Sequence, residues 1–149
     1  MIEPSALQKY ALFGGLKEEQ VAHVISHMSE EYFETGALIA SEGQGLDRIR
    51  FILDGRVRIT RGDLEIAQLR TGDTFGEMEV LDIMPCAADI KAMEPSKCLA
   101  LSNRNLHHIY KDDLLTFSML IMNLARDLSR RLRRMNEIFV QESPVNEWS

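Results

Sequence analysis

The 149-residue sequence contains only two cysteines, Cys86 and Cys98, and four prolines. Two thiols are too few for a disulfide scaffold or for a four-thiolate metal site. The longest uncharged run, from Leu114 to Ala125, is shorter than the roughly 18 apolar residues of a membrane span. The chain also opens without the basic and apolar segments of a secretory signal. These absences predict a cytoplasmic protein with no contact with a membrane.

Positive charge is also in short supply. The chain carries 17 Lys and Arg residues against 23 Asp and Glu residues, a net charge of -6. Such a surface has the wrong sign for nonspecific binding to a phosphate backbone. Hydrophobic residues make up 45% of the chain, enough for one packed domain of this length.

Glycine is rare outside one central stretch, since seven of nine glycines fall between Gly36 and Gly76. Short apolar runs with partial period-two alternation occupy this stretch and the residues that follow it. The predicted strands are 37–41, 49–53, 56–60, 64–69, 89–92 and 97–101. The Asp54-Gly55 and Gly62-Asp63 pairs predict hairpins and therefore antiparallel pairing. Short, closely spaced strands favour a sandwich, a barrel or a jelly roll.

The two ends of the chain show helical periodicity. Residues 16–28 form an amphipathic pattern, with Val21 and Val24 on its apolar face. Near the other end, Asp112 and Asp113 offer an N-cap to a long helix that meets no Gly or Pro before Pro144. The apolar stripe of this helix alternates intervals of four and three residues, with one slip near Arg131. Its members are Phe117, Ile121, Leu124, Leu128, Leu132, Met135 and Phe139.

The most informative segment is 70–92. It combines a turn at Gly72-Asp73, a glycine at Gly76 that permits close backbone approach, and a helical turn over Glu77–Leu81. Free N–H groups at the start of such a turn can bind an anion. The chain then returns through Pro85 into a strand, which predicts an anion cradle grafted onto a β-domain.

Ordered features across the chain resemble the cyclic-nucleotide-binding domain family. They are Leu12-Phe13, Gly36, Ile39, Glu42-Gly43, Phe51–Gly55, Gly72-Asp73, Phe75–Glu77, Pro85 and Ala87-Ala88. The resemblance implies a mainly β fold: an eight-stranded antiparallel jelly roll with flanking helices and a long C-terminal helix. It divides the single domain 1–140 into N-terminal helices over 1–35, the jelly roll over 36–102 and C-terminal helices over 103–140. Residues 141–149 are expected to be a tail.

The same resemblance implies a phosphate-binding cassette. Glu77 would hold the ribose 2′-hydroxyl, and backbone amides near Met78 and Glu79 would face the cyclic phosphate. The family's phosphate-pairing arginine would stand after Pro85, where this chain has Cys86. The predicted ligand-binding residues are Gly76, Glu77, Met78, Glu79, Cys86 and Ala87. On charge alone, Glu77 is equally explained as a favourable carboxylate at a helix start.

The altered charge of the cassette predicts weak or absent binding of cAMP and cGMP. Loss of a charge-assisted hydrogen bond to phosphate costs about 1.5–3 kcal/mol. A carboxylate such as Glu79 or Asp89 about 6 Å from the phosphate adds roughly 3 kcal/mol of repulsion at an effective dielectric of 20. Together these two free-energy costs correspond to a loss of at least two decades in binding affinity. An arginine from elsewhere could restore binding, and the sequence leaves four candidates open: Arg48, Arg50, Arg56 and Arg58.

Other reactive side chains have simpler interpretations. Cys86 is either a redox-sensitive thiol or a buried thiol with a raised pKa. His23 and His27 share a helix face, but a metal site there needs further ligands, and none is expected. His107 and His108 point to different sides of a helix. The β region has no His-x-His pair of the kind found in metal-dependent jelly-roll enzymes, so no enzymatic activity is expected.

The long helix carries the only basic cluster, which includes Arg126, Arg130, Arg131, Arg133 and Arg134. These arginines offset the helix dipole and keep the helix solvated. Too few residues follow the helix for a helix-turn-helix, so no DNA binding by this chain is expected. Its apolar stripe either covers the barrel or, as the resemblance implies, pairs with a second copy. The predicted dimer contacts are Phe117, Ile121, Leu124 and Leu128.

Two functions remain open from the sequence. The first is a stand-alone regulatory or sensor module in which a ligand shifts the C-terminal helices and changes a contact with an unknown downstream protein. The second is a binding-silent relative that serves as a homodimeric protein-interaction scaffold. Neither requires a cofactor, and a cyclic nucleotide is the only ligand that the resemblance suggests.

Overall fold

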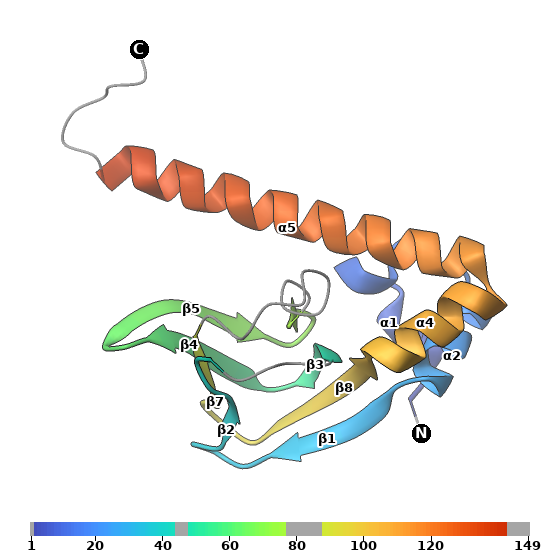
Figure 1. Ribbon diagram of the computed structural model, residues 1–149, viewed down its shortest axis with the longest axis horizontal. Helices are drawn as coiled ribbons and strands as arrows, with labels where there is room; N and C mark the ends of the chain where they lie inside the picture. The colour runs from blue at the N-terminus through green and yellow to red at the C-terminus, as the bar shows by residue number, and fades with distance from the viewer. Residues whose placement is uncertain (1, 44–47, 77–87, 143–149) are drawn as a thin grey trace.

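A computed structural model describes residues 2–43, 48–76 and 88–142 (Figure 1). Eight strands form the β-domain, and helices gather at one end of it. The strands are β1 (Ser29–Phe33), β2 (Leu38–Ala40), β3 (Arg48–Asp54), β4 (Arg56–Arg61), β5 (Leu64–Arg70), β6 (Thr74–Phe75), β7 (Asp89–Ala92) and β8 (Ser96–Ser102). The helices are α1 (Pro4–Leu7), the 3-10 turn η1 (Ala11–Phe13), α2 (Glu18–Ser26), α4 (Asn103–Asp112) and α5 (Leu114–Glu142).

The strands form two four-stranded antiparallel sheets. One has the order β1-β8-β3-β6 and the other the order β2-β7-β4-β5. Apart from β4 and β5, consecutive strands lie in different sheets, so the chain crosses repeatedly from one sheet to the other, as in a jelly roll. The predicted fold class is confirmed, with all six predicted strands present and two more, β1 and β6, at the edges of the first sheet.

β1 lies inside the segment 1–35 that the sequence assigned to helices, so the first sheet begins earlier than expected. Its sequence, Ser-Glu-Glu-Tyr-Phe, lacks the alternation of a half-buried strand because it pairs only with β8. This edge strand contributes Glu31, a residue of importance for the site.

One of the two predicted hairpins is correct. Gly62 and Asp63 join β4 to β5, with Arg61 opposite Leu64 in the register. The hairpin at Asp54-Gly55 is wrong, because β3 and β4 belong to different sheets. Gly55 has φ +127° and a Cβ there would lie 2.2 Å from Ser96 Oγ, so this glycine serves the close passage of the chain over β8.

Two apolar clusters fill the molecule. One lies between the sheets and includes Ile52, Val57 and Cys98. The other lies between the helices and the first sheet, and it includes Ile49, Phe51 and Leu120. Alternation along β3 therefore places Ile49 and Phe51 against the helices, while Arg50 and Ile52 face the space between the sheets.

α5 runs along one side of the molecule above the helices and the strands (Figure 1). Asp113 interrupts the helical backbone between α4 and α5 with φ -150° and ψ 84°. Its carboxylate caps α5 by accepting hydrogen bonds from Thr116 N and Thr116 Oγ1. Asp112, the other expected cap, is instead the last residue of α4. In the described ranges, no helix is both long enough and apolar enough to cross a membrane.

Candidate functional site

The structure describes the two segments that flank the predicted cradle, which we call its entry shoulder and its exit shoulder. β6 and Gly76 lead into it, and Ala88 with β7 leads out of it. Five of the predicted ligand-binding residues lie outside the described residues: Glu77, Met78, Glu79, Cys86 and Ala87. Their assignment therefore stays a prediction. Gly76 and the side chains that surround the two shoulders are the part of the site that the structure describes.

The close backbone approach predicted at Gly76 is present. Gly76 has φ +88°, and a Cβ at this position would lie 2.7 Å from the carbonyl oxygen of Arg48. An L-side chain would suffer both from the left-handed backbone and from this contact. The glycine thus allows the end of β6 to pass directly over the start of β3, just before the predicted cassette.

Alternation settles which way the four candidate arginines point. Val57 and Ile59 of β4 pack between the sheets, so their neighbours Arg56 and Arg58 point out of the barrel and are exposed. Arg56 pairs with Glu94 at 3.8 Å, and Arg58 pairs with Glu65 at 2.7 Å. These two arginines are placed on the outside of the second sheet.

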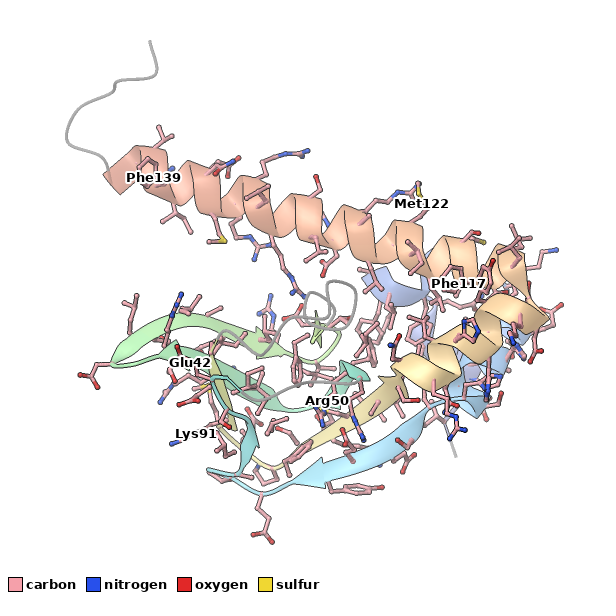
Figure 2. All side chains as sticks on the ribbon, viewed as in Figure 1. Glu42, Arg50, Lys91, Phe117, Met122 and Phe139 are labelled. Carbon is pink, nitrogen blue, oxygen red and sulfur yellow. The ribbon has the colours of Figure 1, made fainter. Side chains whose placement is uncertain are left out.

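Arg50 has the opposite orientation, into the barrel. It is 8% exposed, and its Nε lies 2.7 Å from Glu31 Oε1, across β8 from β3 to β1 (Figure 2). Arg48, two residues earlier, reaches the same carboxylate with Nη1 at 3.3 Å from Glu31 Oε2. Two guanidinium groups therefore share one carboxylate at this end of the barrel.

The Cys98 thiol lies beside this ion pair. Cys98 stands opposite Glu31 on one side and Ile52 on the other, and its side chain is fully buried. Burial raises the pKa of the Cys98 thiol to about 12, with a further rise from Glu31 and a partial offset from Arg50. The thiol is therefore protonated at neutral pH and is a poor nucleophile.

The exit shoulder of the cradle has its own carboxylate. Asp89, at the start of β7, accepts a hydrogen bond from the backbone N of Glu42 at 2.8 Å. This contact ties the end of β2 to the strand that leaves the cassette. Asp89, which the sequence marked as an unfavourable charge, thus has a structural role in joining β7 to the neighbouring loop.

An arginine that the sequence analysis assigned to the solvated basic cluster of the long helix reaches the entry shoulder. Arg131 of α5 donates from Nη2 to the carbonyl oxygen of Thr74, and another contact joins it to Asp127 at 2.8 Å. Thr74 lies two residues before Gly76, so α5 is attached to the barrel at the start of the cassette. A pairing between residues 57 positions apart leaves no local signal in the sequence.

The basic cluster of α5 is therefore only partly a solvated face. Arg134 joins Arg56, Gln68, Arg70 and Asp73 around a polar cavity of about 370 Å³. Arg130 remains at the surface, paired with Asp127 at 3.7 Å. The C-terminal half of α5 thus directs guanidinium groups toward the barrel through Arg131 and Arg134.

One of the four predicted dimer contacts is wrong. Leu124 is 3% exposed and packs in the cluster between the helices and the first sheet, so it belongs to the core of one chain. Phe117 and Ile121 are partly buried against the same cluster, and the ring of Phe117 meets that of Tyr110 edge-on at 5.1 Å. Figure 2 shows Phe117 on the side of α5 toward α4 and Met122 on the opposite side.

Comparison of the sequence with known protein families identifies the class of protein. Residues 30–113, more than half of the chain, match the family model described as "Cyclic nucleotide-binding domain". The chain belongs to the cyclic nucleotide-binding domain family.

Two curated relatives illustrate the family. The chain is 28% identical over 139 residues to a cAMP-dependent protein kinase regulatory subunit from Blastocladiella emersonii, covering 90% of this chain and 31% of that protein. It is 30% identical over 131 residues to the Cyclic AMP receptor protein of Thermus thermophilus, covering 82% of this chain and 57% of that protein. The chain thus spans less than two thirds of these relatives.

Solved structures share the fold. A cyclic nucleotide-binding domain from Methylobacillus flagellatus superposes with a TM-score of 0.85 at 23% identity, over 96% of this chain and 83% of that one. The two-sheet jelly roll with a long C-terminal helix is therefore an architecture that this chain shares with that domain.

Proposed function

We propose that the chain is a non-enzymatic regulatory module of this family whose altered cassette binds cAMP and cGMP weakly or not at all. One observation carries the proposal. Each of the four arginines that could replace the missing phosphate arginine is already paired with a carboxylate: Arg48 and Arg50 with Glu31, Arg56 with Glu94, and Arg58 with Glu65.

The four pairs differ in what their loss would cost. Arg56 and Arg58 form half-exposed pairs worth less than about 1 kcal/mol, but they point out of the barrel. Arg50 faces inward, and moving it to a phosphate would strip Glu31 of its closest partner in a largely buried position. Glu31 would keep only its longer contact to Arg48, a loss of about 2–3 kcal/mol. A phosphate would have to repay this cost before gaining any affinity.

Arg131 is a further cation at the entry shoulder. It is held by the carbonyl oxygen of Thr74 and by the carboxylate of Asp127. An incoming phosphate would compete with both acceptors. The same contact offers a route for regulation, because any ligand that displaces Thr74 or Arg131 would alter how α5 lies on the barrel.

Calorimetric titration of the purified protein with cAMP, cGMP and cyclic dinucleotides tests the proposal. Binding of cAMP or cGMP with a micromolar Kd overturns it. Micromolar binding of a cyclic dinucleotide alone supports a sensor for a different ligand. No heat from any of these ligands at millimolar concentration supports the alternative function, a binding-silent scaffold for protein association.

A specific feature of α5 favours that alternative. Its exposed and partly exposed side chains include a regular heptad pattern, which we call the α5 seam. The α5 seam consists of Leu114, Ile121, Ala125, Leu128, Leu132, Met135 and Phe139. From Ile121 onward the intervals are 4, 3, 4, 3 and 4, as in a coiled coil.

The α5 seam explains the slip that the sequence pattern showed at Arg131. Leu124 turns into the core, and Ala125 takes its place in the heptad, so the pattern continues without interruption. Leu132, Met135 and Phe139 are 60%, 61% and 61% exposed. We propose that this stripe pairs with the same stripe of a second copy, which would bury apolar area that one chain leaves in water.

A further inference from the structure

The helical end of the molecule gathers two histidines and a carboxylate from different elements. His23 lies on α2, His27 is the C-cap residue of α2 one turn later, and Asp112 is the last residue of α4. One ligand atom from each of these three residues lies within 4.8 Å of the other two. We propose that His23, His27 and Asp112 form a binding site for a divalent transition-metal ion of the zinc class.

An orphaned nitrogen supports a ligand at this place. His23 Nε2 is buried, and it has no hydrogen-bond partner among the residues that the structure describes. A buried polar atom without a partner costs about 1–3 kcal/mol, so such atoms call for an explanation. A metal ion that accepts the lone pair of this nitrogen removes the penalty.

The donor set selects the kind of metal. Imidazole nitrogen suits zinc, copper and nickel, whereas magnesium and calcium prefer sites made only of oxygen. Two histidines and one carboxylate are a known ligand combination for zinc, with a fourth position left for water or another side chain. His108 lies one turn before Asp112 on α4, and its ring centroid is 6.2 Å from that of His27.

Binding of a zinc ion requires the three ligand atoms to move only slightly closer together. Zinc bonds of about 2.0–2.1 Å in a tetrahedral site place ligand atoms about 3.4 Å apart. The three ligand atoms here need to close by at most about 1.4 Å from the 4.8 Å limit. The exposed side chain of Asp112 can rotate to provide this movement, while the ring centroids of His23 and His27 are already 5.0 Å apart.

A metal at this site would cross-link α2 to the joint between α4 and α5. The two parts already meet through Gln20 Nε2, which donates to Thr116 Oγ1 at 3.1 Å, and through Asn105 Nδ2, which donates to the backbone oxygen of His27 at 2.9 Å. The ion would add a third link next to Asp113, where the helical backbone is interrupted. Metal binding would therefore stabilise the folded chain and fix the direction in which α5 leaves α4.

The test is calorimetric titration of tag-free protein with ZnCl₂, together with the visible absorption spectrum of the Co²⁺ complex. We expect one ion per chain with a micromolar Kd, and a rise in Tm with zinc. His23→Ala, His27→Ala and Asp112→Asn should each weaken binding at least tenfold. Asp112 is exposed, so Asp112→Asn stays folded and remains informative where a histidine variant is unstable.

His107→Ala is the matched control. His107 is exposed on α4, stacks on Tyr110 and is not one of the three grouped ligands, so its loss should leave zinc affinity unchanged. Cys86→Ser should also retain the affinity. The proposal is overturned if no stoichiometric ion binds, if the three ligand substitutions leave the Kd unchanged, or if Cys86→Ser alone abolishes binding. None of these outcomes depends on whether the cassette binds a nucleotide.

Discussion

Arg50 Nε lies 2.7 Å from Glu31 Oε1, inside the barrel, and joins β3 to the edge strand β1 across β8. Arg50 Nη2 adds a second contact to Glu31 Oε2 at 3.3 Å. The remaining nitrogen, Nη1, is buried and has no hydrogen-bond partner among the described residues. This pair occupies an arginine that faces into the barrel, and it is one reason that we expect no substitute for the missing phosphate arginine.

Arg50→Ala is expected to lower the free energy of unfolding by about 2–3 kcal/mol, because it leaves Glu31 largely buried with only its longer contact to Arg48. Urea unfolding at neutral pH measures the change. Arg58→Ala is the matched control, since its pair with Glu65 is half-exposed and should be worth less than about 1 kcal/mol. Equal effects of the two substitutions would contradict the assignment of the Arg50 pair to the barrel interior.

Gly76→Ala is expected to cost about 2 kcal/mol or more, because a Cβ at φ +88° would lie 2.7 Å from Arg48 O. Gly62→Ala provides the comparison. Gly62 also has a positive φ, +59°, but a Cβ there meets nothing within 4 Å, so only the backbone penalty of about 1 kcal/mol applies. Thermal or urea unfolding of both variants gives the difference, and a smaller loss at Gly76 than at Gly62 would argue against the close passage of β6 over β3.

The Cys98 thiol should be inert in the folded protein, because its pKa is raised to about 12. In a Cys86→Ser background, a thiol reagent at pH 8 is expected to modify Cys98 only after unfolding. The raised pKa also has a consequence for stability. Unfolded chains release the thiol proton above about pH 9 while the folded chain retains it, so stability falls as pH rises from there toward 12.

This loss of stability is specific to Cys98 and should be missing from Cys98→Ala. The difference in free energy of unfolding between Cys86→Ser and the double variant Cys86→Ser with Cys98→Ala should therefore change between pH 8 and pH 11. A constant difference across this range, or rapid modification of the native thiol, would be inconsistent with a buried, protonated Cys98.

Leu132→Glu is expected to convert a dimer into a monomer, because it places a charge in the centre of the α5 seam. Sedimentation equilibrium measures the mass, and the thermal stability of the monomer should change little since Leu132 is largely exposed. Met122→Glu, at an exposed position outside the α5 seam, should leave the mass unchanged. If the parent protein is already a monomer, or if Leu132→Glu stays dimeric, the α5 seam is not the interface.

Sequence patterns predicted the central strands, α2 and the long C-terminal helix, because alternation and helical periodicity record burial directly. Edge strand β1 was missed since only one of its sides pairs and its sequence is polar. The false hairpin at Asp54-Gly55 has a similar origin: a local turn signal was present, but the glycine serves a contact with Ser96, which lies 41 positions away in the sequence.

The site was less accessible to sequence reasoning. The sequence alone shows that Cys86 follows Pro85, where the family resemblance expects an arginine. The partner of Arg50, by contrast, depends on the position of β1. The contact of Arg131 with Thr74 depends on how α5 lies on the barrel. The interface stripe stays a prediction, and only Leu124 is removed from it by the structure, because a helix with two apolar faces gives no indication of which face meets its own core. These contacts join residues far apart in the sequence, where no periodicity can report them.

The most direct test of the weak-cassette account compares cAMP binding by the parent with binding by the double variant Cys86→Arg and Glu79→Ala in paired calorimetric titrations. Restoring the phosphate arginine and removing one carboxylate should tighten binding by at least two decades. A double variant that binds cAMP no better than the parent, or a parent that already binds with a micromolar Kd, would contradict the account.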